Sequence, residues 1–152
     1  MTIENNFLIH VFMGLLSFWG IQGAIALAVR HQALKDQPVV SACDRVLASP
    51  RAFILKIPVA YFAALFYAII LGQLLHMLTT GRPLPPWLAL WILAGFLVTT
   101  GYAWLLFVRL KMTCVRCTRL YLINYAIVAC HVAIYWTTYL EFAEKIIRGE
   151  LL

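Results

Sequence analysis

The sequence predicts an all-α fold, an integral membrane four-helix bundle built from a single domain. Of the 152 residues, 64% are hydrophobic and only 12% are charged, whereas soluble domains have about 25% charged residues. Four apolar runs are long enough to cross a hydrocarbon core of about 30 Å. Backbone groups inside lipid must be hydrogen-bonded within their own segment, so each run is predicted to be a helix. The runs cover residues 7–29, 53–78, 87–108 and 112–140.

The first two runs are separated by the longest polar connection of the chain. No basic segment of the kind found in cleavable signal peptides precedes run 7–29, so we expect a retained helix. Residues 30–52 then form a long predicted loop that contains Pro38 and Pro50. The second predicted helix, 53–78, follows this loop.

Helix-breaking residues also delimit the third and fourth runs. Gly81 and three prolines within residues 79–86 end the second helix, because proline cannot continue a helix from within. Run 87–108 carries no charge, and run 112–140 is charged mainly near its start. The tail, 141–152, mixes charged and apolar residues, which suits either an extension of the last helix or an interfacial amphipathic segment.

Three of the four cysteines gather at one membrane face in this topology. Four spans place both termini on one side and the first and third loops on the other. Cys43 lies in the first loop, and Cys114 and Cys117 begin the fourth helix beside the third loop. Cys130 lies about 20 Å further along that helix, and we expect it to face lipid or to pack.

Cys114 and Cys117 form a C-x-x-C pair whose two sulfurs share one face of a helix. Thiols at this spacing close a disulfide, hold a metal or simply pack as small buried residues. A helix N-terminus together with Arg116 and Arg119 favours the thiolate, which is the nucleophile. A structural zinc site normally needs four ligands, and a second C-x-x-C is absent. No metal is therefore expected, and the preference for redox chemistry over packing rests on the family resemblance described below.

A polar stripe continues from the two thiols along the fourth helix. At 100° per residue it carries Tyr121, Asn124, His131 and Tyr135. Polar groups in membrane helices face the bundle interior or a cavity. We expect a cavity that holds a ring-shaped apolar molecule with a carbonyl, such as a quinone, hydrogen-bonded by Tyr121 or Asn124. The alternative for Asn124 is a hydrogen bond that bridges helices.

Three motifs together resemble the vitamin K epoxide reductase family of membrane oxidoreductases. The first is a loop cysteine followed six residues later by serine, Cys43 to Ser49. The second is the start of the second helix, residues 57–60 with Tyr67. The third is the fourth-helix C-x-x-C pair with its polar stripe: Cys114, Cys117, Tyr121 and Asn124. The resemblance covers about residues 7–138 and is far more specific than the C-x-x-C pair alone.

The resemblance implies a VKOR-like bundle around a pocket for a quinone, ubiquinone or menaquinone. It implies that Cys117 reacts with the quinone, that Cys114 is its disulfide mate, and that Cys43 exchanges with Cys114. Ser49 and Tyr67 would belong to the pocket rim or wall. The implied function is a thiol–disulfide oxidoreductase that takes electrons from a thioredoxin-like or other thiol protein.

Two departures from the family pattern keep other hypotheses open. Residues 35–42 lack the usual second loop cysteine, and Ala63 replaces a common glycine. Either an outside thiol reacts directly with Cys43 or the C-x-x-C pair, or the relay is lost. In the second case the chain would be a non-catalytic subunit or assembly factor of a larger membrane complex. A haem carrier using His10, His76 or His131 and a heavy-metal carrier are weaker alternatives.

The basic residues bear on partners and orientation. The formal charge is +6, and the basic residues cluster beside the apolar runs. We therefore expect them to interact with anionic lipid headgroups, and we expect no nucleic-acid partner. Nine basic residues flank the loops that carry the thiols and three lie on the other side, which favours a cytoplasmic thiol face. The family resemblance instead implies an oxidising compartment. A multi-pass position in a bacterial inner membrane is expected, with the side left open.

Overall fold

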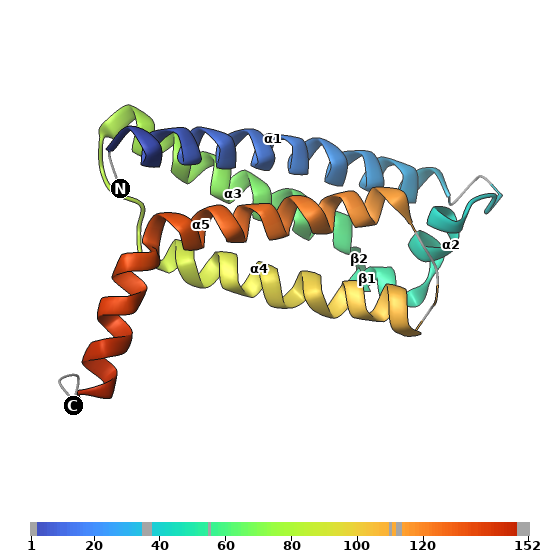
Figure 1. Cartoon of the computed structure of the whole chain (residues 1–152). Helices are drawn as coiled ribbons and strands as arrows, with labels where there is room; N and C mark the ends of the chain where they lie inside the picture. Colours follow the sequence, from blue (N-terminus) through green and yellow to red (C-terminus); the bar gives the residue numbers. More distant parts are fainter. Residues whose placement is uncertain (1–2, 35–37, 55, 110, 112–113, 149–152) are drawn as a thin grey trace.

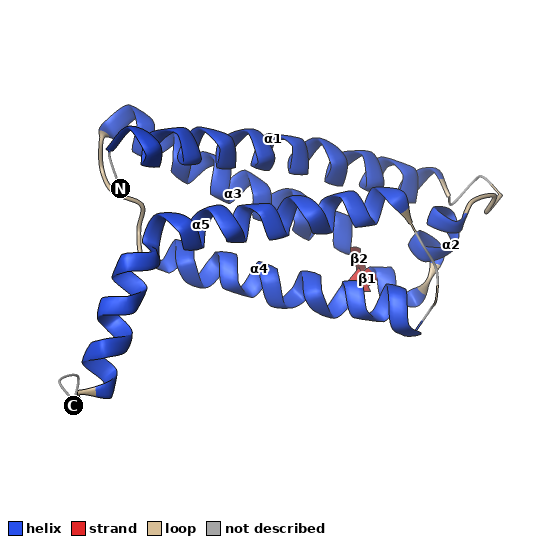
Figure 2. Cartoon of the chain, in the orientation of Figure 1, coloured by secondary structure: helices blue, strands red, loops and turns tan. Residues whose placement is uncertain are grey.

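A computed structural model describes residues 3–34, 38–54, 56–109, 111 and 114–148 of the chain. Four long helices dominate this part: α1 (Ile3–Ala33), α3 (Val59–Thr80), α4 (Trp87–Trp104) and α5 (Val115–Ile147). Each contains or adjoins a stretch long and apolar enough to cross a membrane. The predicted all-α membrane bundle is therefore confirmed, and Figures 1 and 2 show the four helices side by side.

Helix α1 is the centre of the packing, because it lies against both α3 and α5, while α4 packs on α5. The core between them is apolar and includes Met13, Ile70, Leu74 and Ile127. Large apolar side chains also cover the outside of the bundle, which is the expected surface of a protein surrounded by lipid. Examples are Phe12, Leu65, Leu90 and Leu97.

The connection between α1 and α3 is made of short ordered elements rather than one long loop. It holds α2 (Ala42–Ala48), a 3-10 turn η1 (Pro50–Ala52) and an antiparallel pair of strands, β1 (Phe53–Ile54) and β2 (Ile57–Pro58). The second spanning helix thus begins at Val59, and the predicted start at residue 53 is wrong. Lys56 adopts a φ of 67° between the strands, which no helix permits, and Pro58 immediately precedes the helix.

The other helix ends follow the sequence more closely. Helix α3 ends at Thr80, where Gly81 takes a left-handed φ of 68° and donates its N–H to the Met77 carbonyl. Helix α4 continues into a π-helical turn, η2 (Leu105–Arg109). Helix α5 runs on through most of the predicted tail, and its last turns leave the bundle (Figure 1).

The first turns of α1 and the last turns of α5 lie at one end of the bundle, and α2, the two strands and the start of α5 lie at the other (Figure 1). Cys43 belongs to α2, and Cys114 directly precedes α5. The predicted gathering of three cysteines at one end is therefore confirmed.

Close contact between α1 and α3 depends on Gly20. A Cβ at this position would lie 2.7 Å from the ring of Tyr67. The Tyr67 hydroxyl in turn donates a 3.0 Å hydrogen bond to the carbonyl of Leu120. One aromatic side chain thereby joins α1, α3 and α5, and it requires a glycine opposite its ring.

We predict that Gly20→Ala destabilises the bundle by about 1–3 kcal/mol, the usual cost of overpacking a close contact. Thermal unfolding in detergent micelles would report this as a lowered midpoint. Gly72→Ala is the matched control, since a Cβ there meets no atom within 4 Å. Equal midpoints for the two variants would contradict the account of this contact.

Candidate active site

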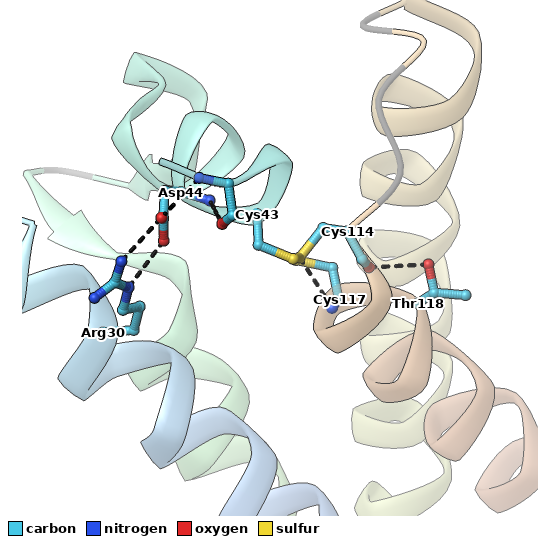
Figure 3. The surroundings of a disulfide bond; sticks show 7 residues. Arg30, Cys43, Asp44, Cys114, Cys117 and Thr118 are labelled. Atoms are coloured by element: carbon cyan, nitrogen blue, oxygen red, sulfur yellow. Dashed lines mark hydrogen bonds and ion pairs between the residues drawn. A yellow bond between two sulfur atoms is a disulfide. The ribbon is translucent and has the colours of Figure 1, made fainter. Parts of the chain in front are cut away.

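A disulfide joins α2 to the start of α5. It links Cys43 to Cys114, whose Cα atoms lie 4.6 Å apart although the residues are 71 positions apart in sequence. Figure 3 shows the two side chains meeting between the elements. The disulfide between Cys114 and Cys117 that the family resemblance implied is thus not the one in this structure, since Cys114 is already bonded to Cys43.

Cys117 is a free, buried thiol one turn further into α5. Its N–H donates to Sγ of Cys114 at 3.4 Å, so the Cys114 sulfur is bonded to one cysteine and contacted by the backbone of another. The Thr118 hydroxyl and N–H both donate to the Cys114 carbonyl, at 3.1 and 2.9 Å. These bonds fix Cys114 at the start of α5.

An ion pair fastens α2 to the end of α1. Arg30 donates from Nε to Oδ1 and from Nη2 to Oδ2 of Asp44, each at 2.9 Å. Such two-point pairs are directional as well as strong. Because Asp44 directly follows Cys43, this pair fixes the cysteine over α5 (Figure 3).

Asp44 also caps its own helix. Its N–H donates to Oγ of Ser41 at 3.1 Å, and its carboxylate accepts from the N–H of Ser41 at 3.1 Å. The Arg30 guanidinium, followed by these cap hydrogen bonds, holds the pKa of Asp44 well below the ordinary carboxyl value, although desolvation acts in the opposite direction. The carboxylate is therefore charged throughout the neutral and mildly acidic range.

Sequence reasoning missed both members of this ion pair as site residues. The signal for Asp44 was present, because Ser41-x-x-Asp44 has the spacing of a capping box. Arg30 carried no comparable signal, since its partner lies 14 residues away across a connection whose path the sequence did not reveal.

A cavity of about 350 Å³ lies beside the free thiol. Cys117 and three of the predicted pocket residues, Tyr121, Tyr67 and Ser49, line it. The remaining walls are mostly apolar side chains of α3 and α4, among them Val59, Ala63, Phe66, Trp91 and Val98. Polar groups that sequence reasoning did not assign to the cavity are His31, Thr99 and Tyr102.

Asn124, the fourth predicted pocket residue, is buried but is not part of this lining. Its amide donates to the Gly95 carbonyl at 3.0 Å and to the Thr99 hydroxyl at 2.6 Å. Both partners belong to α4, so the geometry favours the alternative in which Asn124 bridges helices.

The remaining candidates lie away from the disulfide. Cys130 is a free thiol packed against the core further along α5. His10 and His131 are buried, whereas His76 is exposed. Within the described part of the chain, no three His, Cys, Asp or Glu side chains are grouped as metal ligands would be.

We predict that Asp44→Asn lowers the unfolding midpoint at pH 7, because the Arg30 guanidinium loses the opposing charge of the Asp44 carboxylate. The native pKa of Asp44 is depressed, so the wild-type advantage is complete above the ordinary carboxyl pKa of about 4. It shrinks as the pH falls below that value toward the native pKa. Unfolding midpoints of both proteins between pH 3 and pH 8 measure this difference.

Glu144→Gln is the matched control, because Glu144 forms only an exposed ion pair with Arg148 at 3.5 Å. Exposed pairs of this kind contribute little, so this variant should match wild type across the range. A difference between wild type and Asp44→Asn that does not change with pH would contradict the assigned role of the Asp44 charge.

Comparison with known protein families gives a match over most of the chain. The model of the Vitamin K epoxide reductase family matches residues 11–132, which is most of the chain. Searches of curated protein sequences and of solved structures find no match to this chain. The matched range includes α2, the disulfide and the cavity-lining part of α5. The chain therefore belongs to the vitamin K epoxide reductase family.

Proposed function

We propose that this protein is a membrane thiol–disulfide oxidoreductase that passes electrons from dithiols to a quinone. Membership of its family supports the general class of membrane thiol oxidoreductase. The observation that carries the finer proposal is the position of Cys114, which is bonded to Cys43 and adjoined by Cys117 at the wall of an apolar cavity.

The cavity has the properties that a quinone requires. Its volume of about 350 Å³ falls within the usual range for small-molecule pockets, and its walls are largely apolar. A bound quinone supplies an acceptor for two electrons and two protons. We propose that the Tyr121 hydroxyl, on the same wall as Cys117, donates a hydrogen bond to a carbonyl of the ring.

The first half of the proposed reaction reduces the disulfide. A donor thiolate bonds to Sγ of Cys43, the Cys43–Cys114 bond breaks, and Cys114 leaves as a thiolate. The second thiol of the donor then displaces Cys43, so the donor departs as a disulfide. Since residues 35–42 contain no cysteine, the donor reacts with Cys43 itself.

The second half passes the electrons onward. Formation of a Cys114–Cys117 disulfide releases two electrons and two protons, which match the demand of quinone reduction. The Cys43 thiolate then attacks Sγ of Cys114, the bond to Cys117 breaks, and Cys117 leaves as a thiolate. The Cys43–Cys114 disulfide is restored, and the net reaction converts one dithiol and one quinone into one disulfide and one quinol.

For the location we propose a bacterial inner membrane with the thiol face in the oxidising compartment. Persistent disulfides are typical of oxidising compartments. Three of the basic residues that favour a cytoplasmic thiol face have structural partners: Arg30 pairs with Asp44, and Arg109 and Arg119 lie over Trp104 and Trp19. Their positions are therefore explained by packing as well as by topology.

We predict that Cys117→Ser lowers dithiol-dependent quinone reduction by at least about 100-fold, because the enzyme loses the thiol that completes the second disulfide. The assay measures quinol formation by purified protein given a small dithiol. Cys130→Ser, which removes the other free thiol, is the control and should keep near wild-type activity.

Cys117→Ser protein should still accept two electrons from one dithiol molecule, since its Cys43–Cys114 disulfide remains reducible. Counting free thiols before and after reduction tests this half separately. Retained quinone reduction in Cys117→Ser protein would contradict the proposed scheme. A wild-type disulfide that never turns over would instead support a non-catalytic subunit.

A further inference from the structure

Only one of the two disulfide-bonded cysteines has exposed surface. Cys114 has 0% exposure, whereas Cys43 is partly exposed on α2. Thiol–disulfide exchange requires access to the attacked sulfur. An incoming thiol therefore reacts at Cys43, and the groups around Cys43 determine which donors approach.

Exposed basic side chains flank the two bonded cysteines along the chain. Arg45, Lys111 and Arg116 are exposed, and each lies within three residues of Cys43 or Cys114 along the chain. Asp44, the acid beside them in the described part of the chain, is already paired with Arg30. The Cys43–Cys114 disulfide joins the two segments that carry these charges, so the charges act together on an approaching molecule.

Exposed apolar side chains also lie close to the two bonded cysteines along the chain. Val39 and Val40 precede α2, outside the membrane-spanning stretches, and are 48% and 76% exposed. Val115, next to Cys114, is 80% exposed and is the first residue of the fourth membrane-spanning stretch. An apolar patch rimmed by charge is typical of a surface that binds another protein.

We infer that this surface binds a protein dithiol whose two cysteines lie in an acidic segment. The inference rests on the proposed function and specifies its electron donor. Acidic groups of the donor pair with Arg45, Lys111 and Arg116, while its apolar residues contact Val39, Val40 and Val115. The second donor thiol completes the exchange, because this chain supplies no further loop cysteine within residues 35–42.

The test compares two peptides with the same C-x-x-C core, one flanked by glutamates and one by lysines, as donors to the purified full chain with quinone present. We expect kcat/KM to be at least about 10-fold higher for the acidic peptide at low salt. The ratio should approach one at high salt, because screening weakens electrostatic association. A single-cysteine acidic peptide should be trapped on Cys43, as peptide mapping by mass spectrometry would show.

The double variant Arg45→Glu with Lys111→Glu should remove or reverse the preference for the acidic peptide. Activity with a small uncharged dithiol should stay near wild type in this variant. Arg82→Glu, which alters an exposed residue of the α3–α4 connection at the opposite end of the bundle, is the matched control and should keep the preference.

Equal kcat/KM for the two peptides, with normal activity toward the small dithiol, would overturn the inference and leave the proposed function intact. If the wild-type protein reduces quinone with none of the donors, the proposed function is overturned instead. A double variant that keeps the peptide preference but loses binding to anionic vesicles would show that the surface serves lipid, and would also overturn the inference.

Discussion

The interaction on which the rest of the site depends is the ion pair between Arg30 and Asp44. It joins the end of a membrane helix to a helix of only seven residues, which is too short to be stable alone. With both carboxylate oxygens bound and the Ser41 cap complete, α2 is fixed in position and orientation. Cys43 is thereby held over the start of α5, where Cys114 lies. A mobile connection between α1 and α3 would instead place its cysteine at many distances from the C-x-x-C pair.

The three cysteines form a path from the outside to the bundle interior. Cys43 is partly exposed, Cys114 is buried, and Cys117 lines the apolar cavity. In the proposed reaction Cys114 alternates between the other two, so a donor in water and an acceptor dissolved in lipid never need to meet. Helix packing keeps this path in place: Tyr67 bonds the backbone of Leu120 beside the cavity, and Asn124 ties α5 to α4 behind it. The basic and apolar residues around Cys43 belong to the outer end of the same path.

The parts of the molecule that the sequence predicted are those with strong local signals. Apolar runs of about 20 residues and the Gly81 stop identify spanning helices without any knowledge of tertiary contacts. The order of these helices alone brings three cysteines to one end. The strands β1 and β2 gave no such signal, because two-residue strands form only where the neighbouring elements hold them. Spacing likewise cannot determine which cysteine bonds to Cys114. Whether Asn124 faces the cavity or bridges helices depended on the rotation of α4, and α4 has no charged residue that would mark its inner face.

The central claim is that Cys114 exchanges between two partners, and disulfide mapping of a Cys43→Ser protein tests it most directly. Without Cys43, Cys114 begins as a free thiol beside Cys117. On addition of quinone alone, we predict that a Cys114–Cys117 disulfide forms and that one quinol appears per protein molecule, while Cys130 stays free. If both thiols remain open to alkylation and no quinol forms, then Cys117 does not connect the disulfide to a quinone, and the account is contradicted.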